Sequence, residues 1–292
     1  MIKIENLTFG YKKKAVFNDL HLNIESGKVY GLLGKNGTGK STLLYLMTGL
    51  LQPKSGKITY NGQDVSKRFP STLNDIFIVP EEFYLPAISL KKYVKLNSSF
   101  YPNFSEQQLS DNLNHFELDA DVNLGALSMG QKKKVFMSFA LATNTSLLIM
   151  DEPTNGLDIP GKSQFKKFIV SNMNDDRTVI ISTHQVQDVE KLIENVIILD
   201  NDKLLLNAST VDICRKLYFA NNANNIDTEK ALYASPSLQG HNALLLNEKE
   251  EESVLNLETL FNGVLSNFKE IGRLFCEHKD ENKKPTCSNS PQ

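Results

Sequence analysis

A chain of 292 residues is longer than most single domains, which predicts one large domain with an appendage or two modest domains. Its 40% hydrophobic and 23% charged residues are typical of a globular protein and exclude a disordered or fibrous one. Because 32 basic residues face 34 acidic ones, no global positive field exists to attract nucleic acid, and nucleic acid is not an expected partner.

Two short basic runs, Lys12–Lys14 and Lys132–Lys134, stand out against this balance. Most runs of this kind are solvated faces. We interpret both as such and assign them no function.

The first strands are predicted by alternating apolar and polar residues, which indicate antiparallel strands with one solvated face. The apolar positions are Ile2, Ile4, Leu7, Phe9, Val16, Leu20, Leu22 and Ile24. Val29–Leu33 is different, because it is short and almost wholly apolar, as in a parallel strand covered on both faces. Four later runs share that character: Ile76–Val79, Leu147–Met150, Val179–Ile181 and Val196–Leu199.

Residues 86–142 predict a helical insert. Their apolar residues recur at helical spacing, and convincing buried strands are absent. The spacing is carried by Leu90, Tyr93, Val94, Leu96, Leu109, Leu113 and Phe116. Since strand-like runs flank the insert on both sides, we expect it to project from the body of a parallel sheet.

The composition changes after residue 212, where Asn, Glu and Ser become frequent. We interpret residues 213–275 as a small accessory region with weak structural signals. Residues 276–292 are polar and poor in bulky side chains, which predicts a disordered tail.

A phosphate-binding loop is predicted at Gly34–Ser41, which reads GKNGTGKS and matches G-x-x-x-x-G-K-[ST] between a buried strand and a helical pattern. The glycines let backbone N–H groups turn toward phosphate oxygens at a helix N-terminus. Lys40 would reach the β- and γ-phosphates, and the Ser41 hydroxyl would bind Mg²⁺. The loop residues expected to bind ATP are Gly34, Asn36, Gly37, Gly39, Lys40 and Ser41.

A pair of carboxylates follows the apolar run at Leu147–Met150. Asp151 can hold Mg²⁺ through water, and Glu152 can act as the general base for the attacking water. An Asp-Glu pair after a strand is commonplace, but after a phosphate loop the catalytic interpretation is favoured.

Leu127–Gln131 reads LSMGQ and lies 20 residues before the carboxylate pair. It resembles the signature motif of ATP-binding-cassette (ABC) proteins, with Met129 where glycine is commonest. The resemblance covers residues 1–212 and includes every family landmark in the expected order. It implies an α/β fold of the P-loop NTPase (RecA-like) type, with a parallel-sheet core, an N-terminal antiparallel β-subdomain and the helical insert.

The resemblance also implies roles for four residues that would otherwise be read as structural. Tyr11 would stack on adenine, and Thr42 would contact the α-phosphate. Asp158, within a segment similar to the family's D-loop, would lie at a dimer interface. His184 matches the switch histidine, which contacts the γ-phosphate and orients the water, and so joins Glu152 and Lys40 as a catalytic residue.

One position departs from the family pattern. The family usually ends the strand at Ile76–Val79 with proline and glutamine, whereas this chain has Pro80 and Glu81. Glu81 can still present an oxygen to the metal, together with Ser41 and Asp151, but it adds negative charge and loses the amide donor. Altered coupling or turnover is one consequence, and an exchange of roles with Glu82 is another.

The expected mechanism requires two copies of the chain. The signature turn lies on the helical insert, far from the phosphate loop of its own chain, so a second copy must approach head-to-tail for contact with ATP. Ser128, Gly130 and Gln131 of one copy would then close on the nucleotide of the other. Binding favours the closed pair, and hydrolysis resets it.

The mechanical load is expected to be a separate membrane-spanning permease. Phe83–Val94 would contact it, although the same apolar residues could form core. Leu255–Phe261 is similar to a C-terminal element of exporter-type cassettes, which favours efflux, but it also fits an amphipathic packing face.

Two alternatives remain open: a soluble ABC ATPase that acts on ribosomes or DNA, and a regulatory protein that binds ATP without hydrolysing it. Ribosome-associated members usually carry two cassettes and chromosome-type members a long coiled coil, whereas this chain has one cassette and no heptad run. Only Glu81 and Met129 favour the regulatory alternative, and Glu152 and His184 oppose it.

The cellular location is predicted from the cysteines and from hydropathy. Three cysteines without metal-site spacing, Cys214, Cys276 and Cys287, fit a reducing compartment. No apolar run approaches the roughly 18 residues needed to span a bilayer, and the first residues lack a signal-sequence pattern. We therefore expect a cytoplasmic protein, attached to the membrane through the permease.

Overall fold

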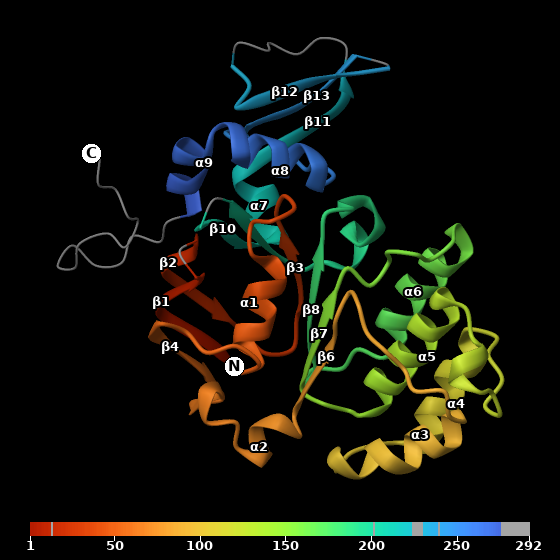
Figure 1. Ribbon diagram of the computed structural model, residues 1–292. Coiled ribbons are helices and arrows are strands. Elements are labelled where there is room, and N and C mark those ends of the chain that lie inside the picture. Colours follow the sequence, from red (N-terminus) through yellow and green to blue (C-terminus); the bar gives the residue numbers. More distant parts are fainter. Residues whose placement is uncertain (13, 201, 224–229, 239, 276–292) are drawn as a thin grey trace. The chain divides into compact units, whose positions relative to one another are not determined.

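The computed structural model describes residues 1–12, 14–200, 202–223, 230–238 and 240–275 (Figure 1). The chain divides into two compact units, Met1–Leu204 and Leu205–Gln292. The predicted disordered tail, residues 276–292, lies outside the described residues. No helix in the described ranges combines the length and apolarity that crossing a bilayer requires.

A six-stranded sheet in the order β10-β9-β3-β8-β7-β6 forms the centre of the first unit. Its strands are β3 (Val29–Leu33), β6 (Ile76–Val79), β7 (Leu147–Asp151), β8 (Thr178–Thr183), β9 (Asn195–Asp200) and β10 (Lys203–Ser209), which leads into the second unit. The pairs β3–β8, β3–β9, β6–β7 and β7–β8 are parallel. All residues of β3, β7 and β8 are buried, which confirms the prediction of strands covered on both faces.

Parallel pairing places the carboxyl ends of these strands at one edge of the sheet, where ligands of open α/β sheets bind. The segments that leave that edge are the phosphate loop after β3, Pro80 and Glu81 after β6, Glu152 after β7 and His184 after β8. The topology therefore gathers the predicted site residues from four separate stretches of sequence.

An antiparallel sheet in the order β2-β1-β4-β5 confirms the predicted β-subdomain. Its strands are β1 (Ile2–Tyr11), β2 (Lys14–Ile24), β4 (Ser55–Tyr60) and β5 (Gln63–Asp64). The buried side chains of this sheet share one hydrophobic core with α1 (Lys40–Met47) and with the central sheet. The helix that follows the phosphate loop is thereby anchored on two sides.

Helices make up the insert between β6 and β7, namely α3 (Leu90–Asn97), α4 (Glu106–His115) and α5 (Met129–Ala142), and α6 (Ile159–Ser171) follows β7. Phe139 of α5 is buried and lies at the centre of an aromatic cluster with Phe77, Tyr93 and Phe104. Figure 1 shows these helices together beyond β6, with α1 beside the antiparallel sheet. The predicted fold class is confirmed.

The remaining short elements are α2 (Pro70–Leu73) and 3₁₀ turns at Val65–Lys67, Ser98–Phe100, Leu124–Ala126, Val186–Asp188 and Glu190–Leu192.

The second unit contains a three-stranded antiparallel sheet in the order β11-β13-β12 with three helices. Its elements are α7 (Thr210–Lys216), β11 (Leu217–Ala223), β12 (Tyr233–Ser237), β13 (Gly240–Leu246), α8 (Leu257–Ser266) and α9 (Phe268–Phe275). Helix α8 packs closely on β13, since a Cβ on Gly263 would come within 2.7 Å of Leu244 Cδ2. Leu257 and Leu260 are buried, as the amphipathic-packing interpretation of Leu255–Phe261 expects.

A buried hydrogen bond ties β4 to the segment between α2 and β6. The Tyr60 hydroxyl donates to Asp75 Oδ2 (2.5 Å), while Asp75 Oδ1 accepts from the Ser146 backbone N–H (2.9 Å). Burial and the Asp75 hydrogen bond raise the pKa of Tyr60. We expect Tyr60→Phe to lower the free energy of unfolding by about 1–3 kcal/mol, because the carboxylate loses a buried donor. Urea titration would measure the change, and Tyr84→Phe, at an exposed tyrosine, should leave it unaltered.

Candidate active site

The phosphate loop is held in shape by its glycines. Gly37 and Gly39 have φ values of +82° and +98°, in the left-handed region that glycine adopts without strain. A Cβ on Gly39 would come within 2.7 Å of Val16 Cγ1, and one on Gly34 within 2.8 Å of the Leu199 carbonyl oxygen. The loop is therefore tightly packed at Gly34 and Gly39, whereas a Cβ on Gly37 would meet no atom within 4 Å.

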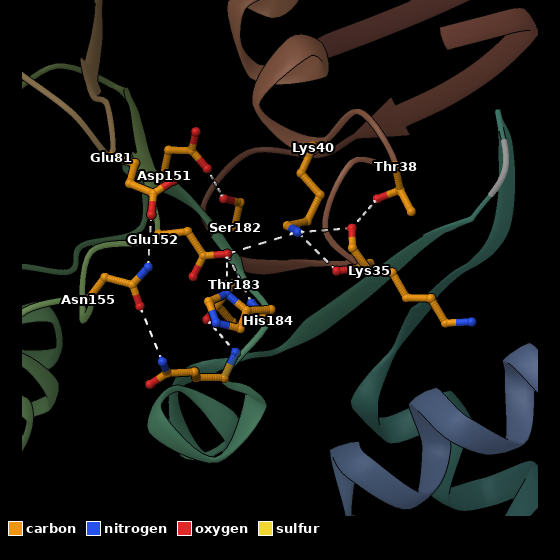
Figure 2. Close-up of polar contacts among 12 residues, drawn as sticks. Lys35, Thr38, Lys40, Glu81, Asp151, Glu152, Asn155, Ser182, Thr183 and His184 are labelled. Atoms are coloured by element: carbon orange, nitrogen blue, oxygen red, sulfur yellow. Dashed lines mark hydrogen bonds and ion pairs between the residues drawn. The ribbon is translucent and has the colours of Figure 1, made fainter.

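Lys40 opens α1 and folds back over the loop. Its side chain is 7% exposed, and Nζ donates to the carbonyl oxygen of Gly34 (2.9 Å) and, more weakly, to that of Lys35 (3.4 Å), as Figure 2 shows. Burial lowers the pKa of Lys40, and the nearby carboxylates of Glu152 and Asp151 oppose that shift. A single ammonium is thus aimed into the concave side of the loop.

Two carboxylates stand at the end of β7. Asp151 is buried and accepts a hydrogen bond from the Ser182 hydroxyl of β8. Glu152 is 4% exposed, and its Oε1 lies 3.9 Å from Lys40 Nζ and 2.8 Å from His184 Nδ1, while accepting the His184 backbone N–H at 3.1 Å. The other oxygen, Oε2, is buried without a hydrogen-bond partner. Figure 2 shows Glu152 between Lys40 and His184.

The signature turn begins α5 with a capping box. Ser128 Oγ accepts from the Gln131 backbone N–H (3.3 Å), and Gln131 Oε1 accepts from the Ser128 N–H (3.0 Å). Ser128, Gln131 and Met129 are exposed, Met129 by 62%. A Cβ on Gly130 would make only ordinary contact, at 3.4 Å from the Gly156 carbonyl oxygen. Packing within the chain therefore does not require glycine at position 130.

Comparison with known proteins identifies the family. Residues 17–155 match the family model described as ABC transporter. The lantibiotic transport ATP-binding protein SrtF of Streptococcus pyogenes is 33% identical over 208 residues, which cover 70% of this chain and 90% of SrtF. The chain belongs to the ABC transporter family.

Further relatives agree with this assignment of the ABC subunit. The bacitracin transport ATP-binding protein BcrA of Bacillus licheniformis is 30% identical over 209 residues, covering 70% of this chain and 68% of BcrA. A solved structure of an ATP-binding subunit of an ABC transporter superposes with a TM-score of 0.67 at 25% identity and covers 74% of this chain and 92% of its own. The chain is an ATP-binding, ATP-hydrolysing subunit of an ABC transporter.

The residues of this ABC subunit fit Mg²⁺ bound together with ATP. A buried carboxylate oxygen without a partner, as at Glu152 Oε2, is costly and calls for a water or other ligand beside it. Ser41 and Asp151 offer the oxygen ligands that Mg²⁺ prefers, and Mg²⁺ bound to a nucleotide usually takes few protein ligands. In the described part of the chain, no group of three or more His, Cys, Asp or Glu is placed to hold a metal ion by itself. The oxygens therefore suit a metal shared with phosphate rather than a separate metal centre.

Tyr11 and Thr42 lie beside each other at the start of α1 in the ABC subunit. The Tyr11 hydroxyl lies 3.4 Å from Thr42 Oγ1, and Phe9 contacts the Tyr11 ring edge-on with centroids 5.0 Å apart. Tyr11 is 50% exposed, so part of its side chain is accessible to a ligand. The structure thus brings together two residues that are 31 positions apart.

Glu81, the position that departs from the family pattern, contacts the loop after β7. Its Oε1 accepts from Asn155 Nδ2 (2.9 Å), and Asn155 Oδ1 accepts from Gln185 Nε2 (3.3 Å). Figure 2 shows the Asn155 side chain directed toward Glu81. Both Glu81 and its neighbour Glu82 are exposed. The sequence did not predict this contact, because positions 81 and 155 are 74 residues apart and no local pattern links them.

Asp158 caps α6 in the ABC subunit, since its Oδ1 accepts from the Gly161 backbone N–H (2.9 Å). The Asp158 side chain is exposed, and the next residue, Ile159, is strongly exposed although apolar. A helix cap explains the aspartate, but not the exposed isoleucine. Such a pair is compatible with a surface that another subunit covers.

Lys133 corrects the interpretation of Lys132–Lys134 as a solvated face. The Lys133 side chain is 6% exposed, and its Nζ donates to the backbone carbonyl oxygens of Glu152 (3.0 Å) and Asn155 (2.9 Å). Burial lowers the pKa of Lys133, and the Glu81 carboxylate opposes this shift. The prediction was wrong for Lys133 because this residue shares the inward face of α5 with Met137, four positions later.

A separate polar pocket of about 390 Å³ lies at the other edge of the sheet. Its lining includes Ser26, Ser146 and Arg177, which precede β3, β7 and β8. The nucleotide-binding elements follow these strands instead. This pocket is therefore distinct from the candidate active site.

Proposed function

We propose that this ABC subunit powers export through a separate membrane permease, by hydrolysing ATP between two copies of the chain. The observation that carries the proposal is the setting of Glu152. One of its oxygens is engaged by Lys40 and His184, and the other is buried and free to accept a proton. Relatives named for lantibiotic transport, bacitracin transport and Nod factor export support the direction.

In the proposed reaction, Glu152 Oε2 takes a proton from water while the water oxygen attacks the γ-phosphorus. The bond from that phosphorus to the bridging oxygen breaks, leaving ADP and inorganic phosphate. Because Glu152 Oε1 already accepts from the His184 backbone, an ionised Glu152 requires the proton of the ring contact to lie on His184 Nδ1. In the neutral ring His184 Nε2 can then accept a hydrogen bond from the water, and in the imidazolium it can donate to the γ-phosphate.

Phosphate would be bound by the loop residues Gly34, Asn36, Gly37, Gly39, Lys40 and Ser41, with Thr42 at the α-phosphate and Tyr11 against adenine. The N-terminus of α1 and the Lys40 ammonium favour the polyphosphate charge. When bound, Mg²⁺ neutralises phosphate charge, and Ser41 and Asp151 would hold it, with Glu81 as a third candidate. Glu81 Oε1 accepts from Asn155, so its second oxygen, Oε2, would face the metal.

A second copy would supply Ser128, Gly130 and Gln131. The exposure of Ser128 and Gln131, and the freedom from internal packing at Gly130, support a role outside the chain. In the same arrangement Asp158 and the exposed Ile159 would lie at the interface. The γ-phosphate would distinguish the closed pair from the open one, which is the differential binding that a switch needs.

We assign residues 1–212 to the nucleotide-binding domain, with a helical insert at about 86–142, and residues 213–275 to an accessory region. Phe83–Val94 would contact the permease, and Tyr84, 84% exposed, is the prominent side chain there. The subunit would thus work at the cytoplasmic face of the membrane without crossing it.

Purification of the tagged chain from membranes in mild detergent tests this function. We expect a multi-span protein to co-purify and to depend on Tyr84, so that Tyr84→Ala reduces its recovery. Leu238→Ala, at an exposed residue of the second unit, is the matched control. Co-purification of ribosomes or DNA without a membrane protein would contradict the transporter assignment and support the soluble alternative.

A further inference from the structure

We propose that Lys133 is a positioning residue, which holds the backbone around the catalytic base and balances the charge of Glu81, Asp151 and Glu152. The inference rests on the proposed function for its catalytic part. Its structural part, a buried cation matched to a group of carboxylates, can be tested without ATP.

The first argument is geometric. Glu152 has a φ of +46°, an unfavourable backbone conformation for a residue with a side chain, so the surroundings must maintain it. The turn is closed by the Asn155 N–H, which donates to the Glu152 carbonyl oxygen at 3.2 Å. Lys133 Nζ binds that same oxygen and the Asn155 carbonyl oxygen, and so fixes both ends of the turn.

The second argument is the number of charges. Three carboxylates, Glu81, Asp151 and Glu152, act on Lys133, and the same three act on Lys40. The hydrogen bonds from Lys133 to Glu152 and Asn155 go to neutral carbonyl oxygens, so these three carboxylates are what balances the charge of the buried ammonium. Lys40 would also bind the phosphates of ATP. Lys133 would therefore balance the charge of the three carboxylates alone.

The third argument links Lys133 to Glu81. Asn155 accepts from Lys133 through its backbone and donates to Glu81 through its side chain. One residue therefore connects the signature helix α5, the loop after β7 and the segment after β6. Glutamine at position 81 would keep an acceptor for Asn155 while removing the negative charge, so geometry and charge can be separated.

The test is a double-mutant cycle of Lys133→Met and Glu81→Gln, read as kcat and KM for ATP and as the melting temperature without nucleotide. We expect Lys133→Met to lower kcat about tenfold or more while KM changes less than about twofold, since the base and not the phosphate loop is disturbed. It should also lower the melting temperature. Glu81→Gln in that background should restore kcat and the melting temperature in part, by a factor of about three or more in kcat.

Lys134→Gln is the matched control, because it removes the same charge from the next residue of α5. Its ammonium contacts Gln164 and the Phe116 ring instead of the loop after β7, and kcat should stay within about twofold of the unmutated chain. If Lys133→Met does not fold, Lys133→Gln, which keeps a hydrogen-bond donor, takes its place in the cycle.

The inference is overturned if the Lys133 variant keeps the kcat of the unmutated chain, or if Glu81→Gln has the same effect with and without Lys133. Failure of the proposed function gives a different result, in which the unmutated chain itself releases no phosphate. In that case the cycle in melting temperature still decides whether Lys133 and Glu81 are coupled.

Discussion

Glu152→Gln is expected to abolish ATP turnover while ATP continues to bind. The amide has the shape of the carboxylate and can still accept from the His184 backbone N–H through its oxygen. It cannot take a proton from water, and a general base contributes roughly 10²–10⁴-fold to a rate. Because hydrolysis is the step that would reset the closed pair, the variant should accumulate as an ATP-bound dimer.

Phosphate release, equilibrium ATP binding and size-exclusion chromatography with ATP measure the three parts of this prediction. Glu117→Gln, at an exposed glutamate of the helical insert, is the control and should behave like the unmutated chain. Unchanged phosphate release in Glu152→Gln would refute the assignment of the base. A monomer that binds ATP but never dimerises would refute the two-copy site.

Lys40→Ala is expected to weaken ATP binding roughly ten- to a hundredfold, since a hydrogen bond to a charged group contributes about 1.5–3 kcal/mol. The loss is limited because the backbone N–H groups of the loop and the N-terminus of α1 remain. It should exceed the effect at any exposed lysine, because Lys40 Nζ is buried and already directed into the loop.

Titration calorimetry with a non-hydrolysable ATP analogue measures this change without interference from turnover. Lys35→Ala is the control from the same loop, and Figure 2 shows its side chain extending away from Lys40. An unaltered dissociation constant in Lys40→Ala would contradict the phosphate-loop assignment.

The parts of the fold that sequence predicted are those where one local rule governs a whole element. The strands β3, β7 and β8 are buried along their entire length, so their apolar runs had a single interpretation. The phosphate loop was equally clear, because glycine is required at Gly37 and Gly39 by backbone conformation. The carboxylates were predicted from the apolar run before them, and the signature turn from its resemblance to the motif of ABC proteins.

The remaining features depend on contacts between distant residues, which a single sequence does not encode locally. Lys133 looks like a surface lysine until α5 is packed, and the Glu81–Asn155 hydrogen bond joins positions 74 apart. The second unit gave weak signals because β12 has no fully buried residue and therefore lacks a clear apolar pattern. Tertiary packing decides each of these cases.

Helix α5 carries two functions on one rigid element, because Ser128 caps its N-terminus and Lys133 lies in its second turn. In a head-to-tail pair, its first turn would sense the nucleotide of the neighbouring subunit, whereas Lys133 acts on the base that serves its own. Loss of the γ-phosphate at one catalytic centre would then displace α5 and so change the surroundings of the base at the other centre. Crosstalk of this kind makes the two centres interdependent, and turnover would rise cooperatively with ATP concentration.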